Sequence, residues 1–410
     1  MKMVKSLILG SAAGLIAMSG AQAADLPVKA KAVEYVRICS LYGAGFYYIP
    51  GTDTCIKLGG YVRIDTTFNG GVYGQPFYSG DAGQGNRYRD QFNSRSRMAL
   101  TVDTRTATAY GVVRTFGQGD FQFQNFGTTN PGNPAANFPG NGLNNALLST
   151  AGGGYVAVEM VFIQFAGFTF GKSASAFAAP WNGYPGNNNS FLMGGHDTVT
   201  GVNNIQYTAQ FGNGVSGTIG LDDPTVFHRT SVQNLALGVN VNGNGTNAYG
   251  GIAAPDIVGN IRVDQAWGLL QLSAGAHLVN ASYNNLSAGG APNNLSEISG
   301  HPDSKWGFAV QGALQIKNIP TGAGDDIKFS AVYSQGNTKE VISTSGGSPS
   351  FAMFGNSGLG YQSVGFGNTS DGVYLPGVGG TNGIILTKAW GLRGAFNHNW
   401  DPYWSSSLWG

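Results

Sequence analysis

Residues 56–68 read IKLGGYVRIDTTF, and apolar and polar side chains alternate along this stretch. One face carries Ile56, Leu58, Gly60, Val62, Ile64, Thr66 and Phe68, and the other carries Lys57, Gly59, Tyr61, Arg63, Asp65 and Thr67. Side chains of a β-strand point alternately to its two faces, so a period of two predicts a strand with one apolar and one polar face.

The same alternation recurs along the chain and predicts thirteen strands. We place them at residues 56–68, 95–104, 108–116, 155–165, 168–173, 203–212, 215–222, 257–264, 269–278, 306–316, 327–335, 386–398 and 404–410, the last one incomplete. For 108–116, 155–165 and 168–173, the pattern does not define which alternate side chains point inward.

The connections between these strands alternate strictly between long and short. The long ones are 69–94, 117–154, 174–202, 223–256, 279–305 and 336–385, and the short ones are 105–107, 166–167, 213–214, 265–268, 317–326 and 399–403. Outer-membrane barrels have tight periplasmic turns and long external loops. A soluble sandwich also alternates its side chains, but it has no reason to place every long loop at one end. The sequence predicts an all-β fold, a transmembrane antiparallel β-barrel.

Composition agrees with a β-rich chain. Of 410 residues, 42% are apolar, 10% are charged and 66 are glycine. Such apolar content argues against intrinsic disorder, and no strict Gly-X-Y period supports collagen. With 22 basic against 21 acidic residues, the charge balance gives no reason to expect a nucleic-acid partner.

Residues 1–23 have the features of a secretory signal peptide. Two lysines precede a small apolar stretch, and Ala21-Gln22-Ala23 predicts cleavage between Ala23 and Ala24. A transmembrane anchor is the alternative, but the apolar stretch has about 14 residues where a span needs about 20. Loss of Lys2 and Lys5 changes the net charge from +1 to −1.

The exported chain contains two cysteines, Cys39 and Cys55, in the mature N-terminal segment 24–55. An even pair in an exported protein predicts a disulfide, here closing a small loop. A metal half-site is the alternative, but no histidine or further cysteine lies nearby in the sequence.

The polar faces of the strands are expected to line a lumen, because the apolar faces would contact lipid. A barrel of about sixteen strands leaves a water-filled channel. The charged residues that we expect to line the passage or its constriction are Arg63, Asp65, Arg97, Asp103, Arg114, Arg262, Asp264, Lys328 and Arg393. Arg63 and Arg97 lie on neighbouring strands, and Arg114 is a candidate to extend their row. Alternatively, these arginines are solvated lumen residues without a role in selectivity.

Residues 24–65, ADLPVKAKAVEYVRICSLYGAGFYYIPGTDTCIKLGGYVRID, closely resemble the mature start of the alphaproteobacterial general porins. FIQFAGFTFGKSAS at 162–175 and VNNIQYTAQFGNGVSGTIGLDD at 202–223 match in character. The resemblance implies a sixteen-stranded, homotrimeric diffusion channel for small hydrophilic solutes and ions. It implies a location in the outer membrane of a Gram-negative bacterium, among lipid and lipopolysaccharide, and neither enzyme activity nor a cofactor.

The resemblance also implies that the third external loop, by position 174–202, folds inward to narrow the pore. Asp197 is the single acidic residue of that segment, which also holds Trp181, Tyr184 and Phe191. The sequence therefore predicts a near-neutral to mildly anion-preferring pore.

The end of the chain departs from the family pattern. Family members finish with a closing strand that ends in Phe, whereas this chain stops at Ser405-Ser406-Ser407-Leu408-Trp409-Gly410. Single-chain bacterial barrels have an even number of strands, so we expect a C-terminally truncated barrel over 56–410 that lacks about three strands, or about 80 residues.

Sequence motifs for nucleotide binding, metal binding or catalysis are weak or absent. Gly212–Gly217 fits GxGxxG, but an alternating strand follows where the nucleotide motif needs a helix. Residues 167–173, GFTFGKS, have too few residues between the glycines for a phosphate loop and lie within a strand. The histidines show no zinc-binding spacing, and no GxSxG motif occurs.

Three alternatives stay open. Asp222-Asp223 and Asp325-Asp326 supply hard oxygen ligands that suit calcium, although they also suit turns at strand ends. A barrel enzyme would need a serine and a histidine on one face, as Ser273 and His277 are. A secreted adhesin would bind through its loops and need no lumen.

Overall fold

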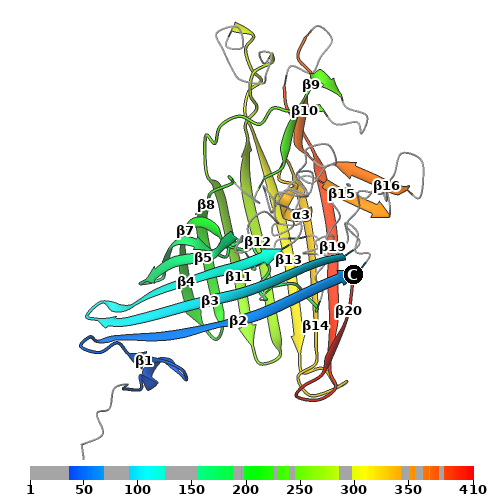
Figure 1. Ribbon diagram of the computed structural model, residues 1–410. Helices are drawn as coiled ribbons and strands as arrows, with labels where there is room; N and C mark the ends of the chain where they lie inside the picture. Colours follow the sequence, from blue (N-terminus) through cyan, green and yellow to red (C-terminus); the bar gives the residue numbers. More distant parts are fainter. Residues whose placement is uncertain are drawn as a thin grey trace, which may run out of the picture.

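A computed structural model describes residues 37–68, 92–124, 155–181, 183–187, 195, 198, 200–225, 229–239, 245–285, 298–342, 351–355, 363–368, 370–377 and 383–410. Most of the described strands form one antiparallel sheet in chain order, which curves into a wall (Figure 1). Its strands are β1 (Tyr47–Tyr48), β2 (Thr54–Phe68), β3 (Phe92–Thr108), β4 (Gly111–Gln124), β5 (Tyr155–Phe165), β6 (Phe168–Ser173), β7 (Val202–Gly212), β8 (Val215–Asp222), β11 (Asp256–Gln265), β12 (Gly268–Val279), β13 (Lys305–Lys317), β14 (Asp326–Gln335), β19 (Lys388–Asn399) and β20 (Ser405–Trp409).

The wall is apolar on its outer face and polar on its inner face. Val62 and Ile64 on β2 are 75% and 74% exposed, and Leu272 on β12 is 61% exposed. The neighbour of Leu272 in the chain, Gln271, is 2% exposed on the other face. Contact of the apolar outer face with water would be unfavourable, since large apolar side chains are normally buried in soluble proteins. Lipid makes it favourable, because the outer side chains then lie in hydrocarbon.

All thirteen predicted strands are present in this sheet, so the prediction of an antiparallel barrel wall is confirmed. Among the described residues, no helix is long and apolar enough to cross a bilayer. The predicted turns 166–167 and 213–214 are confirmed without a shift.

The predicted connection 105–107 is wrong. Residues 105–107 continue β3, and the turn lies at Ala109-Tyr110. β4 also continues to Gln124, eight residues beyond the predicted end at Phe116. Thr104, Thr106 and Thr108 keep the alternation going without a glycine or asparagine to end it, and the turn follows only before Gly111.

The long connections contain strands that the sequence did not predict. β9 (Ser231–Val239), β10 (Gly245–Asn247), β17 (Ser370–Tyr374) and β18 (Ile385–Leu386) form a four-stranded sheet. β9 and β17 pair in parallel although they come from different connections. The other additions are the hairpin β15 (Phe351–Gly355) and β16 (Ser363–Asn368), and the helix α3 (Lys339–Ile342). β9 and β10 lie beyond the end of the wall opposite the short turns (Figure 1).

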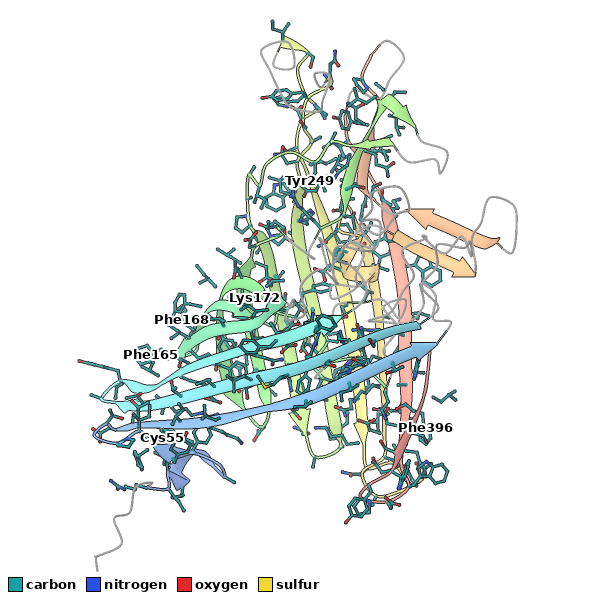
Figure 2. The ribbon with its side chains drawn as sticks, in the orientation of Figure 1. Cys55, Phe165, Phe168, Lys172, Tyr249 and Phe396 are labelled. Carbon is teal, nitrogen blue, oxygen red and sulfur yellow. A yellow bond between two sulfur atoms is a disulfide. The ribbon has the colours of Figure 1, made fainter. Side chains whose placement is uncertain are left out.

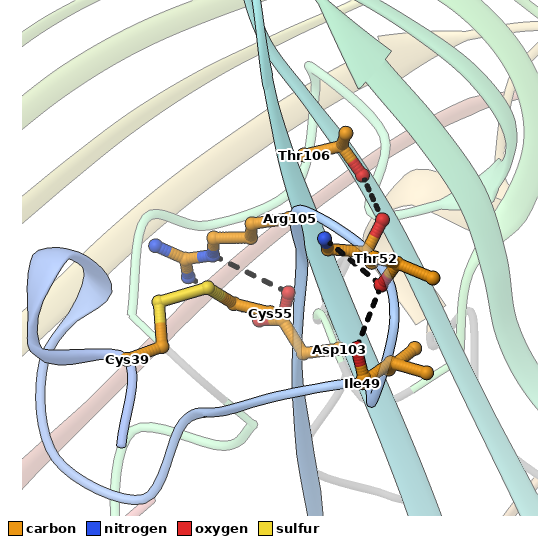
Figure 3. The surroundings of a disulfide bond; sticks show 8 residues. Cys39, Ile49, Thr52, Cys55, Asp103, Arg105 and Thr106 are labelled. Carbon is orange, nitrogen blue, oxygen red and sulfur yellow. Dashed lines mark hydrogen bonds and ion pairs between the residues drawn. A yellow bond between two sulfur atoms is a disulfide. The ribbon is translucent and has the colours of Figure 1, made fainter. Parts of the chain in front are cut away.

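The predicted disulfide between Cys39 and Cys55 is present, next to the start of β2 (Figure 3). Both cysteines are buried with Phe46, and the loop contains the 3-10 helix Ser40–Tyr42. The guanidinium of Arg105 on β3 lies 4.8 Å from the Phe46 ring centroid. The bond and this cation–π contact fasten the N-terminal loop to the short-turn end of the wall.

Candidate functional site

Charged side chains gather on the inner face of β2 and β3. Arg63 lies opposite Arg97, and Asp65 lies opposite Arg95. The Asp65 carboxylate accepts from Arg63 Nε at 2.8 Å and from Arg95 Nη2 at 2.8 Å. Arg97 Nη1 lies 2.9 Å from Asp120 Oδ2, and its Nε donates to Gln122 on β4. Each arginine of the row therefore has a carboxylate partner within ion-pair distance.

A β-bulge in β5 directs a further acid inward. Gln118 on β4 pairs with Met160, but the next residue, Gly119, pairs with Val158, so Glu159 is the extra residue of the bulge. A bulge changes which side chains face inward. Val158 and Val161 are both exposed on the outer face, while Glu159 is buried.

Glu159 contacts two other parts of the inner wall. Its Oε2 accepts from Thr200 Oγ1 at 2.6 Å, and its backbone carbonyl accepts from Lys172 Nζ at 2.8 Å. Lys172, labelled in Figure 2, projects from β6. Glu159 therefore binds the C-terminal end of the 174–202 segment to the wall.

Sequence reasoning missed Arg95, Asp120, Glu159 and Lys172 as members of this cluster. Arg95 shares the polar parity of Arg97, so the alternation already contained that signal. Asp120 fell in a stretch that we expected to be a loop, and the bulge conceals the parity of Glu159. Together with Arg63, Arg97 and Asp65, the cluster contains four cations and three anions.

Most of the remaining predicted residues lie near the short turns. Asp103 is 3.0 Å from Arg114 Nη2 and 3.3 Å from Arg105 Nη2. Arg114 pairs in register with Arg105, so it does not extend the row of Arg63 and Arg97, whose partner on β4 is Gln122. The eight-residue separation of Arg114 and Gln122 amounts to about 26 Å along a strand.

Two more predicted positions lie toward the same end of the wall. Asp264 is 2.8 Å from Arg262 and 3.1 Å from Lys317. Lys328 is 3.6 Å from Asp326. These pairs are separate from the cluster on β2 to β6, so the predicted residues do not form one ring.

The described residues of the segment 174–202 lie against the inner face of the wall. The backbone carbonyls of Ala176, Phe177 and Ala178 accept hydrogen bonds from side-chain amides on three successive strands. The donors are Asn260 on β11 at 2.7 Å, Gln311 on β13 at 2.8 Å and Gln271 on β12 at 2.7 Å, in the order of the three carbonyls. The buried amides satisfy backbone acceptors that water would otherwise have to reach.

The same segment continues to the last strands. The Pro185 carbonyl accepts from Asn397 Nδ2 on β19 at 2.9 Å, and the Asn187 N–H donates to Ser407 Oγ on β20 at 3.0 Å. Described residues 174–187 therefore cross the inner face from β11 to β20.

Arg393 on β19 is buried under this segment. Its Nε donates to Ser330 Oγ at 2.9 Å, and its guanidinium lies 5.8 Å from the Trp181 ring centroid. A Cβ on Gly195 would approach the guanidinium carbon within 2.5 Å, so a side chain at residue 195 would displace it. Arg393 is 3% exposed and binds the segment to the wall.

Some predicted positions lie outside the described residues, namely Asp197 and the cleavage site Ala23–Ala24. Within the described ranges, no group of three or more His, Cys, Asp or Glu side chains is placed to hold a metal ion. Asp325, a candidate calcium ligand, is buried and hydrogen-bonded to Thr321 and Asn399.

The porin subfamily matches residues 25–410. The chain belongs to this family. Membership places it in the bacterial outer membrane and agrees with the inner and outer faces described above.

The predicted resemblance to alphaproteobacterial porins is confirmed by the relatives: porin Omp2b of Brucella suis is 34% identical over 271 residues, 65% of this chain and 64% of the relative. Porin Omp2b of Brucella abortus (strain 2308) is 35% identical over 277 residues, 65% of this chain and 63% of the relative.

The match spans less than two thirds of the length of these curated relatives. Among solved structures, the outer membrane channel DcaP of Acinetobacter baumannii is similar with a TM-score of 0.52, over 88% of this chain and 79% of that chain. At 13% identity this similarity shows the fold alone.

Proposed function

We propose that the protein is an outer-membrane porin, a water-filled channel through which small hydrophilic solutes and ions diffuse passively. The observation that carries this proposal is the sorting of side chains along each strand. Large apolar groups such as Val62 and Leu272 are exposed outward, while Asp65, Arg97 and Gln271 face inward. Only a lipid surround and a hydrated interior make both faces favourable. No chemical step is needed, so the protein acts as a channel and not as an enzyme.

The segment 174–202 narrows this passage. Its support is the row of three amide donors that fix residues 176–178 to the inner face, together with the contacts of Pro185 and Asn187 to β19 and β20. The residues that line the passage around it are the cluster on β2 to β6 and the pairs near the short turns.

The pore is near-neutral to mildly anion-preferring. In the cluster on β2 to β6, four cations face three anions, and most charges are within ion-pair distance of an opposite charge. Paired charges leave only a weak net field across the passage, and Arg63, whose side chain is 42% exposed, is the most accessible of the paired arginines.

The assembly that we propose is a homotrimer surrounded by outer-membrane lipid and lipopolysaccharide. Chemical cross-linking of the detergent-extracted protein tests the trimer. Products that stop at three subunits support it, and a product series without a limit contradicts it.

Liposome swelling tests the channel. The full-length protein, as its gene encodes it, is reconstituted into lipid vesicles and exposed to sugars of graded size. Passive diffusion gives uptake that falls with solute size and does not saturate with solute concentration. Vesicles that take up no sugar while holding correctly folded β-sheet protein would contradict the proposal, and saturable uptake would indicate a specific carrier.

A further inference from the structure

A second segment enters the interior beside 174–202. The chain leaves β14 at Gln335 and turns inward at Gly336, whose φ is +72°. Residues 338–340, Thr338, Lys339 and Glu340, are fully buried, and the helix α3 contacts β14 and β19. In Figure 1, α3 lies within the curve of the wall. We name residues 336–341 the inner strap.

The inner strap contacts the segment 174–202 at two places. The Gly195 N–H donates to the Val341 carbonyl at 2.8 Å. The Val341 side chain packs on a buried apolar cluster that includes Ala176 and Phe177. The strap therefore touches both an early and a late described part of that segment.

Asp371 on β17 holds the inner strap by hydrogen bonds to Thr338. Its Oδ1 accepts from the Thr338 N–H at 2.8 Å and from Thr338 Oγ1 at 3.0 Å. Its Oδ2 accepts from the Thr230 N–H at 2.8 Å. The Thr338 and Thr230 hydroxyls also bond to each other at 2.8 Å.

This carboxylate is fully buried among residues of two connections, 223–256 and 336–385, and of the wall strand β12. Besides Thr230 and Thr338, its Oδ2 lies 3.8 Å from His277 Nε2 on β12, and the same ring nitrogen lies 2.8 Å from the Tyr249 hydroxyl. Figure 2 labels Tyr249 near the end of the wall, below β9 and β10. Asp371 therefore joins the four-stranded sheet to the wall and to the strap.

We propose that the constriction of the pore has two parts, the 174–202 segment and the inner strap, and that Asp371 is a positioning residue that holds both through Thr338. This inference rests on the proposed channel function. The path runs from Asp371 to Thr338, along the strap to Val341, and from Val341 to Gly195. Loosening the contact between Asp371 and Thr338 widens the passage, although the Asp371 side chain does not line the passage.

Asp371→Asn tests the path, because an amide has one acceptor oxygen and cannot accept from both threonine N–H groups with the same geometry. Thr338→Val keeps the N–H contact to Asp371 and removes the hydroxyl contacts to Asp371 and Thr230. Asp303→Asn is the matched control, since it removes an exposed carboxylate of the same kind from the connection before β13.

The full-length protein, as its gene encodes it, and each variant are reconstituted for liposome swelling with a monosaccharide and a disaccharide. We expect Asp371→Asn to raise the disaccharide rate relative to the monosaccharide rate at least about twofold, and Thr338→Val to raise it less. Asp303→Asn keeps the original ratio. The double variant Asp371→Asn/Thr338→Val is no wider than Asp371→Asn alone, because both changes act on one contact.

The outcomes separate this inference from the proposed function. If the unchanged protein gives no swelling, the channel function is wrong. If the unchanged protein conducts but Asp371→Asn and Thr338→Val keep its sugar ratio, the two-part constriction is wrong. Should Asp371→Asn fail to fold, Val341→Ala tests the second contact of the strap with the segment 174–202, because it removes apolar contact to the buried cluster that includes Ala176 and Phe177. An unchanged ratio there also overturns the inference.

Discussion

Ala166 adopts a backbone conformation that L-residues rarely take. It forms a two-residue turn with Gly167, and the φ angles are +50° and +86°. Asn213 and Gly214 form the equivalent turn between β7 and β8, with φ angles of +49° and +74°. Two positive φ angles are typical of a type I′ hairpin turn, which favours Asn-Gly.

Ala166→Asn should therefore stabilise the protein by about 0.5–1 kcal/mol, because asparagine tolerates this region better than alanine. Urea-induced unfolding from lipid vesicles, followed by tryptophan fluorescence, measures the change. Asn213→Ala is the reciprocal control and should destabilise by a similar amount. An Ala166→Asn protein that unfolds at lower urea than the original would show that the turn is not limited by backbone strain.

Asp325, in the turn before β14, makes a pH-dependent contribution to stability. Hydrogen bonds from Thr321 Oγ1 at 2.6 Å and from the Asn399 N–H at 2.8 Å, together with the nearby His398 ring, lower the pKa of the Asp325 carboxyl to about 2. A pKa below the ordinary value of 3.8 means that the stabilisation is complete above about pH 4 and is lost as the pH falls through about 2.

The variant Asp325→Asn tests this contribution. Its melting temperature should lie below that of the original protein at pH 5, and the difference should shrink as the pH falls from about 4 to about 2. Thermal unfolding followed by circular dichroism at several pH values measures both curves. A difference that stays constant over this range would assign the effect to lost packing and not to the carboxylate charge.

At the scale of the strand, the outer face of β11 tests the lipid contact. Ile261 is 63% exposed on that face. Ile261→Arg should destabilise the membrane-inserted protein by about 2–4 kcal/mol, the cost of a basic residue near the middle of the bilayer. Urea titration in lipid vesicles gives the value.

Gln118→Arg is the matched control for that variant. Gln118 lies on the inner face of β4, where its amide is 3.3 Å from Asp120, so a new cation there has a carboxylate beside it. We expect a cost of about 1 kcal/mol or less. Equal costs for the two variants would mean that the outer face does not contact lipid.

The elements differ in how far the sequence predicted them. Thirteen strands were predicted because their alternation is local, and the Asn213-Gly214 turn because its residues favour one turn type. The four-stranded sheet was missed, since Ser370 pairs with Ser231 and such distant pairing leaves no local period. Glu159 was missed because one extra residue in β5 reverses the parity on which the prediction depended.

At the scale of the whole molecule, selectivity depends on the sum of the inner charges. A reversal potential in a KCl gradient should be close to zero with a small anion preference, because the cluster on β2 to β6 contains one cation more than anions. Arg63→Gln removes the exposed member of the row and should shift the potential toward cations. Clear cation preference in the original protein would refute the assignment of these residues to the passage.

The sequence by itself predicted the disulfide, thirteen of the fourteen strands of the wall and the polar face of most of them, because each depends on residues that are close in the chain. Tertiary structure alone decided that Arg97 pairs with Asp120, that Arg393 is buried under Trp181, and that Asp371 reaches Thr338. These contacts join segments that are far apart in the chain. Within the wall, the pairing of strands depends on where a turn lies and on the bulge in β5. In the interior, the contacts depend on how two connections pack together. Hydrogen-bond and charge satisfaction select that arrangement only when the whole wall has formed.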